Sequence, residues 1–193
     1  MPNWHAATLV CYNTISLANT ASTLPAVFMP CASVDPTSGG VHMIALETLR
    51  KSDVFSGLPD EELMIIAKMA HEETYEPGVQ IFNENDAAKH LYIVVEGRVV
   101  IMIDIARGRQ AVIDTVTRGG SFGWSALVPP YIFTGTAQAV DRVRLIAVPG
   151  DELKGLCKVN CAMCYTIMER LATIVSRRLM ETRLQLIALM YRS

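Results

Sequence analysis

The stretch GGSFGWSALVPPYIFTGTAQA, Gly119 to Ala139, is the part of the sequence that decides the fold. Its first five residues predict a tight loop with exposed backbone N–H groups, and Trp124 to Leu127 predict a single helical turn. A glycine loop that leads into a helix start is suited to hold a phosphate. The stretch nevertheless contains no Lys, Arg, Asp or Glu. A bound anion would therefore need a neutralising partner from elsewhere in the chain.

Short runs rich in Val, Ile and Thr surround this loop and predict β-strands. Each stretch contains a run of roughly six to nine residues of this kind and is bounded by Gly, Pro or Asp. The runs are VQIFNEND, HLYIVVEG, RVVIMIDIARG, RQAVIDTVTRGG and TAQAVDRVRLIAVPG. Several short strands at this spacing indicate a sandwich or a barrel. The residues ARGR, 106–109, predict a hairpin turn between two of them.

Helices are predicted before and after the strands. Residues 43–57 predict one short helix, and LPDEELMIIAKMA predicts a second, because Pro59 and the acidic residues after it suit a first turn. Asp151 is the expected cap of a helical turn at DELKGLC, and Asn160 is the expected cap of a much longer helix. That last segment contains no Gly or Pro through Ser193. About 32 helical residues would span about 48 Å.

The predicted C-terminal helix has a wider apolar surface than one contact requires. One stripe consists of Cys164, Met168, Leu171, Val175, Leu179 and Leu186. The neighbouring positions Met163, Ile167, Ile174 and Leu184 widen it. Two contacts are therefore expected, one with the chain's own barrel and one with a second copy in a parallel homodimer. A helix buried within a single core is the alternative.

This order of helices, strands, glycine loop and long helix resembles the cyclic-nucleotide-binding domain of the Crp/Fnr regulators. YEPGVQIFNENDAAKHLYIVVEGRVVI is similar to the first half of that domain, GGSFGWSAL to the start of its phosphate-binding cassette, and IMERLATIVSRRLMET to its dimerising helix. The resemblance extends from about Leu46 to the C-terminus. It implies an α+β fold that is mainly β, with an antiparallel jelly-roll barrel and a long C-terminal dimerisation helix. Asn85 stands where the family usually has Gly, and Asn tolerates the left-handed conformation.

The resemblance also implies which residues form the ligand pocket. They are Gly120, Phe122, Gly123, Trp124, Ser125, Ala126, Phe133, Thr134, Thr182 and Arg183. In members that bind cyclic AMP or cyclic GMP, Trp124 matches a Glu that accepts from the ribose, and Phe133 matches an Arg that pairs with the phosphate. Thr182 matches a base-contacting position, and Arg183 stands where a small hydroxyl residue is common.

Both charged partners of the nucleotide are thus replaced by aromatic residues. Loss of a desolvated charged partner costs about 2–5 kcal/mol. The resemblance therefore implies dissociation constants above about 100 µM for cyclic AMP and cyclic GMP.

Three interpretations of this pocket remain open. In the first, Trp124 and Phe133 fill the cavity, and the domain is a structural or interaction module. In the second, the pocket is retained for an apolar or aromatic ligand, since the fold alone does not choose the effector. In the third, a nucleotide still binds, with Arg118 or Arg142 in place of the lost cation.

Composition and motifs limit the other function classes. The 193 residues carry a net charge of −2, which does not favour a nucleic-acid partner, and no apolar run is long enough to span a membrane.

Five cysteines, an odd number, indicate reduced thiols and a cytoplasmic protein. Core thiols are the expected role of Cys157, Cys161 and Cys164, with a metal or cluster site as the alternative. The four histidines are scattered and predict no metal or haem site, and no cofactor is expected. No nucleophile elbow, P-loop or recognisable carboxylate pair is present, so an enzyme is not expected.

Three regions are expected along the chain. Residues 1–42 contain one acid, Asp35, and no Lys or Arg, and they predict a loosely ordered leader. Residues 43–160 are expected to form the helices and barrel, and residues 161–193 the dimerisation helix. Because the chain stops at Ser193, where the family's transcription factors continue into a helix-turn-helix domain, direct DNA binding is not expected. The leading hypothesis is a stand-alone sensor domain that acts through dimerisation or partner contact. The alternative is the effector domain of a cyclic-nucleotide-responsive DNA-binding regulator.

Overall fold

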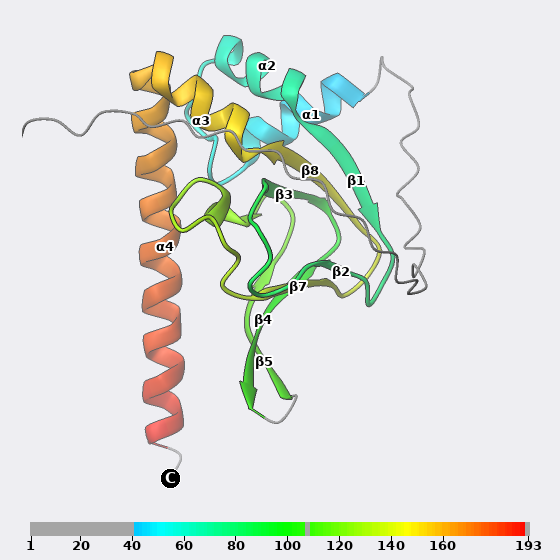
Figure 1. Ribbon diagram of the computed structural model, residues 1–193, viewed down its shortest axis with the longest axis vertical. Helices are drawn as coiled ribbons and strands as arrows, with labels where there is room; N and C mark the ends of the chain where they lie inside the picture. The colour runs from blue at the N-terminus through cyan, green and yellow to red at the C-terminus, as the bar shows by residue number, and fades with distance from the viewer. Residues whose placement is uncertain (1–40, 107–108, 192–193) are drawn as a thin grey trace, which may run out of the picture. The chain divides into compact units, whose positions relative to one another are not determined.

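Two four-stranded antiparallel sheets form the centre of the fold in the computed structural model, which describes residues 41–106 and 109–191 (Figure 1). The sheets have the strand orders β1-β8-β3-β6 and β2-β7-β4-β5. The strands are β1 His71–Tyr75, β2 Gln80–Phe82, β3 His90–Glu96, β4 Val99–Ala106, β5 Arg109–Val116, β6 Ser121–Phe122, β7 Thr136–Ala139 and β8 Val143–Pro149. This arrangement confirms the predicted fold, which is mainly antiparallel β with flanking helices. The predicted hairpin is also confirmed, because Ala106 of β4 pairs with Arg109 of β5.

In the sequence, two α-helices precede the strands and two follow them. They are α1 Val41–Lys51, α2 Asp60–Met69, α3 Gly150–Val159 and α4 Cys161–Met190, with a short 3-10 turn, η1, at Trp124–Ala126. The long helix predicted after Asn160 is confirmed, and Asn160 caps it by accepting a hydrogen bond from the Met163 N–H at 3.0 Å. Asn85 adopts the expected left-handed conformation, with a φ of 71°.

Two predictions of helix ends are wrong. The first helix ends at Lys51 rather than near residue 57, because Ser52 bonds back to the backbone. Its hydroxyl donates to the Leu49 carbonyl at 2.7 Å and accepts from the Phe55 N–H at 3.2 Å, which favours a turn over continued helix. Asp151 does not cap α3, because the helix already begins at Gly150; it lies in the first turn and pairs with Lys154 at 2.9 Å. The expected boundary at residue 43 falls inside α1, and residues 1–40 lie outside the described part of the chain.

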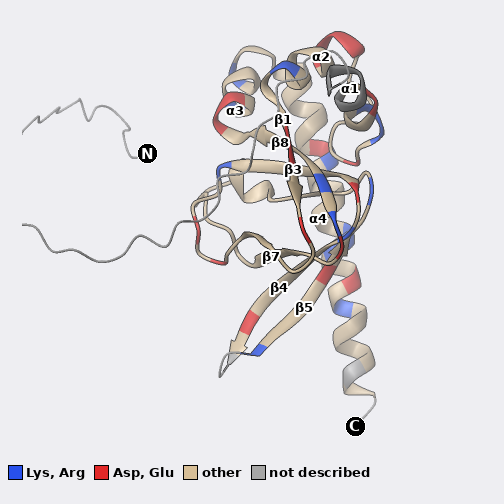
Figure 2. Cartoon of the chain, turned by 90° about the vertical axis from the view of Figure 1, so that its right-hand side faces the viewer, with Lys and Arg blue, Asp and Glu red and all other residues tan. Residues whose placement is uncertain are grey.

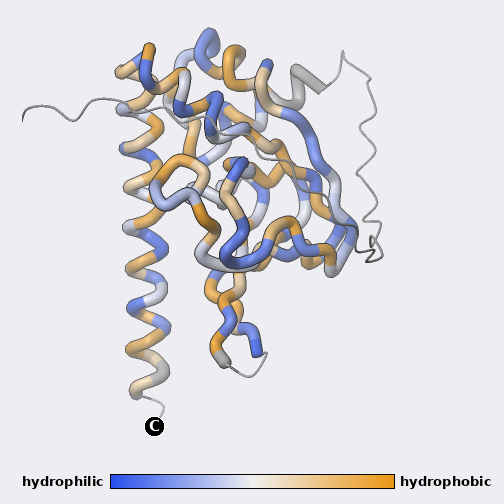
Figure 3. Tube along the Cα trace, in the orientation of Figure 1, coloured by the Kyte–Doolittle hydropathy of each residue, from blue (hydrophilic) through white to orange (hydrophobic). Residues whose placement is uncertain are grey.

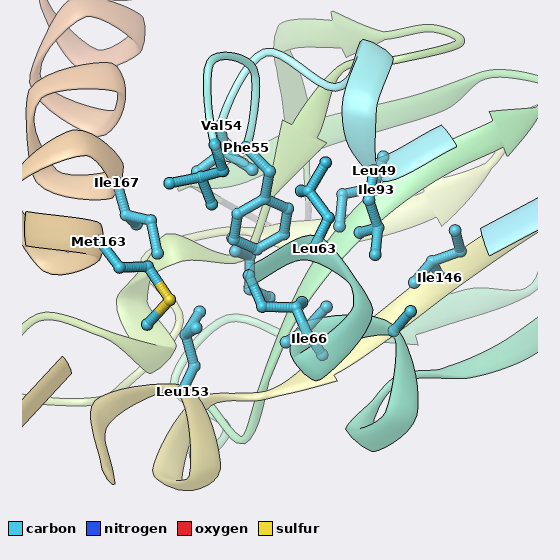
Figure 4. Close-up of a cluster of buried hydrophobic side chains, with 14 of the residues drawn as sticks. Leu49, Val54, Phe55, Leu63, Ile66, Ile93, Ile146, Leu153, Met163 and Ile167 are labelled. Carbon is cyan, nitrogen blue, oxygen red and sulfur yellow. The ribbon is translucent and has the colours of Figure 1, made fainter. Parts of the chain in front are cut away.

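The larger core joins one sheet to all four α-helices (Figure 4). Phe55, Leu63 and Ile66 of the N-terminal region meet Ile93 and Ile146 of the sheet. Its other fully buried members include Leu49, Leu91, Leu153, Met163 and Ile167. Burial of each large apolar side chain contributes about 1.5–3 kcal/mol. The first half of α4 is therefore part of the chain's own core.

The second half of α4 extends past this core. Its apolar positions recur along the helix in Figure 3, and Figure 2 shows one acidic segment with basic segments on either side of it. Leu179, Leu186 and Met190 are 50%, 59% and 70% exposed. None of the described helices combines the length and apolar character that crossing a bilayer requires.

Candidate functional site

The glycine loop contains a left-handed backbone position at Gly123. Gly123 has a φ of 79°, and a Cβ atom at this position would lie 2.9 Å from the carbonyl oxygen of His90. Both facts demand glycine. The loop then enters η1, where the Ala126 N–H donates to the Gly123 carbonyl at 3.1 Å and the Leu127 N–H to the Trp124 carbonyl at 2.8 Å. The predicted single helical turn is therefore confirmed.

Aromatic side chains fill the space inside this loop. Phe133 is 5% exposed and stacks on Phe82, with ring centroids 3.6 Å apart and planes 8° from parallel. Phe122 and Tyr92 stack beside them at 5.2 Å. The cavity that remains against the loop has a volume of about 50 Å³. This space is far smaller than the roughly 300–1,000 Å³ of small-molecule sites, so it does not hold a nucleotide in this arrangement.

A cation from α4 lies over the mouth of the loop. The Arg178 guanidinium carbon is 4.3 Å from the centre of the Trp124 ring, and its Nε is 2.9 Å from Asp114 Oδ2 on β5. The same guanidinium donates to the Ser121 carbonyl at 2.9 Å. Burial lowers the pKa of Arg178, while the Asp114 and Asp53 carboxylates act in the opposite direction. Arginine stays protonated in proteins, and the charge of Arg178 is already paired with Asp114 within the chain.

A larger pocket opens outside Arg178, between β5, Trp124 and α4. Its volume is about 310 Å³, at the lower end of the range of small-molecule sites. It is lined by Ile101, Val112, Ile113, Asp114, Thr115, Trp124, Thr134, Arg178, Glu181, Thr182 and Gln185. Two acids and one base line it, so its formal charge is −1. An anionic ligand would meet net repulsion there.

The structure gathers most of the residues expected in the pocket, but in two adjoining spaces. The small inner cavity is lined by Phe122, Gly123, Trp124, Ser125, Phe133 and Thr134. Trp124 and Thr134 also line the outer pocket, together with Thr182. Gly120, Ala126 and Arg183 line neither space. Ala126 is fully buried and Arg183 is exposed.

Neither arginine considered as a replacement cation lines the inner cavity or the outer pocket. Arg118 lines a separate pocket with Glu47 and Glu96, and Arg142 pairs with Glu76 at 3.4 Å. The arrangement described here therefore does not favour the interpretation that one of them takes the place of the lost cation. Arg178 occupies that region instead, and the sequence reasoning missed it. No local pattern identified it, because its partner Ser121 is 57 residues away in the sequence.

The six positions of the expected dimer stripe have different environments in the single chain. Leu171 is 5% exposed and is largely covered by the chain itself, which leaves it little surface for a partner. Cys164 and Met168 are half-buried. Val175, Leu179 and Leu186 are 42%, 50% and 59% exposed. The surface open to a partner therefore begins near Val175.

Two groups of potential metal ligands come together in the fold. His71 Nε2 lies 2.9 Å from Glu73 Oε1, and its ring meets the His90 ring edge-on at 5.3 Å. Cys157 and Cys164 are free thiols at the junction of α3 and α4. Within residues 41–106 and 109–191, no three His, Cys, Asp or Glu side chains are arranged to hold a metal ion. His5, Cys11 and Cys31 lie outside the described residues, and so does the side chain of His42.

Comparison with known proteins agrees with this geometry. A family model for the cyclic nucleotide-binding domain matches residues 72–160. A solved structure from Geobacter metallireducens, described as a cyclic nucleotide-binding protein, is 32% identical, with a TM-score of 0.63 and coverage of 70% of this chain and 98% of that one. The chain belongs to the cyclic nucleotide-binding domain family.

Crp-like members of this family are also similar to the chain. The CRP-like cAMP-activated global transcriptional regulator of Mycobacterium tuberculosis is 24% identical over 145 residues, which cover 75% of this chain and 63% of the relative. The catabolite activator protein of Thermus thermophilus is 26% identical, with a TM-score of 0.61 and coverage of 72% of this chain and 64% of that one. The chain thus spans just under two thirds of the length of these relatives. They are regulators rather than enzymes by name, and the resemblance to Crp/Fnr regulators is confirmed.

Proposed function

We propose that this chain is a Crp-type regulatory domain that does not bind cyclic AMP or cyclic GMP in the usual way. The observation that carries the proposal is the Phe133–Phe82 stack, which fills the interior of the glycine loop. A cyclic phosphate seated on the loop would have to displace this stack. The free energy of stacking and burial would be lost, because aromatic pairs contribute about 0.5–1.5 kcal/mol beyond the area that they bury.

Electrostatics in the site oppose a cyclic nucleotide as well. The only base among the residues lining the two spaces is Arg178, which already forms an ion pair with Asp114 and donates a hydrogen bond to the Ser121 carbonyl. A phosphate could use this cation only by competing with Asp114. Glu181 adds a second negative charge to the outer pocket. Weak binding of a nucleotide anion follows from both facts.

The outer pocket supports a sensor more than a purely structural module. A volume of about 310 Å³ is enough for a small effector, and its apolar side is formed by Ile101, Val112 and Ile113. The pocket lies between the sheet and α4, so a ligand there would touch both. The domain would then act as a homodimer through α4, or by contact with a protein partner, and without catalysis.

Isothermal titration of cyclic AMP and cyclic GMP tests the proposal. Dissociation constants above about 100 µM are expected for both. The variant Trp124→Glu/Phe133→Arg/Phe82→Ala provides the matched comparison, because it restores both family charges and opens the cavity. We expect it to bind at least about tenfold more tightly, a gain of about 1.4 kcal/mol. Micromolar binding by the natural sequence would refute the proposal.

A second candidate function is the effector domain of a cyclic-nucleotide-responsive transcription regulator. The name of the Mycobacterium tuberculosis relative, a cAMP-activated global transcriptional regulator, favours it. In this case Arg178 would release Asp114 and pair with the phosphate. Binding by the natural sequence that is abolished in Arg178→Ala and retained in Arg177→Ala would support this candidate.

A further inference from the structure

A polar pocket lies between α1, the end of β3, the start of β8 and the turn that leads into β6. Its volume is about 430 Å³, larger than the volume of about 310 Å³ of the outer pocket. It shares no lining residue with the inner cavity or the outer pocket. Its lining is polar or charged apart from one valine and one glycine, and consists of Glu47, Thr48, Lys51, Val95, Glu96, Arg118, Gly119 and Arg144. An apolar ligand would therefore find little favourable contact there.

The backbone around the polar pocket is held by hydrogen bonds and close packing. The Gly119 N–H donates to the Val94 carbonyl at 2.8 Å, and the Gly119 carbonyl accepts from the Asp53 N–H at 3.0 Å. A Cβ atom at Gly119 would lie 3.4 Å from the Lys51 carbonyl oxygen, so the turn is in close contact with the end of α1. Leu49 of α1 is fully buried in the larger core. The pocket is therefore formed in advance of a ligand, as most small-molecule sites are.

The charge of the polar pocket is opposite in sign to that of the outer pocket. Three bases and two acids line it, so its formal charge is +1. Lys51 Nζ lies 2.6 Å from Glu47 Oε1. Arg144 is divided between Glu96 and Glu72, which stands outside the lining, with a nitrogen 3.5 Å from an oxygen of each carboxylate. Both contacts are longer than the usual N–H···O range of about 2.7–3.2 Å, so Arg144 retains N–H groups for a ligand.

Arg118 is the cation of the polar pocket that its own chain compensates least. It follows β5 directly, and its side chain is exposed. Within residues 41–106 and 109–191, Arg118 forms no ion pair with a carboxylate. A guanidinium presents a planar fork of N–H donors that matches two oxygens of a phosphate. Arg118 is therefore the expected anchor for an anionic group.

We propose that the polar pocket binds a small phosphate monoester that also carries hydroxyl groups. The phosphate accepts hydrogen bonds from Arg118, Arg144 and Lys51. Lys51 can turn from Glu47 to the phosphate at little cost, because its side chain and that of Glu47 are 65% and 67% exposed. Ionised Glu47 and Glu96 only accept hydrogen bonds, so they require donors on the ligand, which its hydroxyl groups supply. This inference goes beyond the proposed function and does not depend on it.

A ligand in the polar pocket would touch the first residue of the glycine loop. Gly119 lines the pocket, and two residues later the Ser121 carbonyl accepts from Arg178 at 2.9 Å. The ligand would thus bind next to the segment that holds Arg178, while the outer pocket lies beyond that residue. The domain would then have two distinct sites for small molecules.

Titration of the full chain with glycerol 3-phosphate tests the proposal, with NMR of the backbone and indole N–H groups as the measurement. A dissociation constant of about 1 mM or lower is expected. The N–H signals of Val95 and Gly119 should move, whereas the indole signal of Trp124, which lines the other two spaces, should move less. Inorganic phosphate should bind at least about threefold more weakly, because it lacks the glycerol hydroxyls. Glycerol alone should not bind.

Variants of two exposed arginines provide the decisive comparison. Arg118→Ala should weaken binding of glycerol 3-phosphate at least about tenfold, because charge-assisted hydrogen bonds are lost. Arg118→Gln keeps the start of the aliphatic stem and should weaken it to a similar extent. Arg109→Ala is the matched control and should bind as the natural sequence does, because Arg109 is exposed at the β4–β5 hairpin and lines none of the three spaces. Unchanged N–H signals away from the pocket verify that each variant is folded.

Four results would overturn the proposal. The first is the absence of any movement of the Val95 and Gly119 signals, and the second is movement of the Trp124 signal alone, which would assign the binding to the candidate site. The third is equal binding by Arg118→Ala, Arg109→Ala and the natural sequence. The fourth is equal binding of inorganic phosphate and glycerol 3-phosphate, which would show that the carboxylates of the pocket recognise no hydroxyl groups.

Discussion

Arg178 is the residue on which the candidate site depends most. It connects α4 to β5 through Asp114, to the glycine loop through the Ser121 carbonyl, and to Trp124 through its ring face. The Arg178 and Asp114 side chains are only 17% and 24% exposed. An ion pair in such a position adds little net free energy to folding, because both charges lose solvation. Removal of one partner is nevertheless destabilising, because the other charge is then left poorly solvated and unpaired.

Arg178→Ala is therefore expected to lower the free energy of unfolding by about 2–3 kcal/mol. Arg177→Ala is the matched control, since Arg177 is 59% exposed and its nearest contact to Asp53 is 3.8 Å. A loss below about 1 kcal/mol is expected there. Urea unfolding followed by circular dichroism measures both, and equal losses in the two variants would contradict the role given to Arg178.

Asp53 predicts a dependence of stability on pH. Burial raises its pKa above the ordinary value of 3.8, against the opposing effects of the Ser121 hydroxyl and the two arginines. A carboxyl with a raised pKa in the folded state costs stability when ionised, and the cost is removed as the pH falls through that pKa. Asp53→Asn should therefore be stabilised relative to the natural sequence at neutral pH, and the difference should shrink toward pH 4.

Asp141 supplies a control of opposite sign. Hydrogen bonds from Arg98 lower its pKa, so its contribution is present above the ordinary value and is lost only in more acidic solution. Asp141→Asn should be less stable than the natural sequence by a nearly constant amount between pH 7 and pH 4. If the difference in the free energy of unfolding between Asp53→Asn and the natural sequence stays constant from pH 7 to pH 4, burial does not control the ionisation of Asp53.

Among the elements, the α3–α4 junction rests on one side chain. Asn160 accepts from the Met163 N–H and donates to Glu62 Oε1 of α2, so it caps α4 and ties three helices together. Asn160→Ala should lower the free energy of unfolding by about 1–2 kcal/mol. Asn160→Ser keeps an oxygen that can accept from the helix N-terminus, so its free energy of unfolding should fall by less. An equal loss in both variants would assign the effect to the Glu62 contact alone.

The elements also show what the sequence can predict and what it cannot. Alternating apolar residues and turn residues were sufficient to predict the strands, and the lack of Gly and Pro was sufficient to predict α4. The end of α1 was missed because a local bond of Ser52 overrides an otherwise helical pattern. Trp124 and Phe133 could be identified because they lie within a contiguous motif. Arg178 could not, since its partner Ser121 is 57 residues away and only the packing of α4 brings them together.

At the scale of the whole molecule, α4 has apolar surface that its own chain does not cover. Val175, Leu179, Leu186 and Met190 are all at least 42% exposed and are spaced by four, seven and four residues. This spacing keeps them along one face of the helix, as in a coiled-coil seam. The side chains that pack on the chain's own core, including Ile167, Leu171 and Ile174, lie on an adjoining face. A second copy of α4 can therefore cover the exposed seam without disturbing the core.

The natural sequence is accordingly expected to be a homodimer in solution at tens of micromolar. Val175→Glu places a charge in the seam and should give monomers, because a desolvated carboxylate without a partner costs several kcal/mol. Thr173→Glu is the matched control, since Thr173 is exposed and residues two positions apart do not share a helix face. Light scattering on all three proteins decides the question, with circular dichroism to verify that each one is folded. A monomeric natural sequence, or equal dissociation in both variants, would exclude assembly through this face of α4.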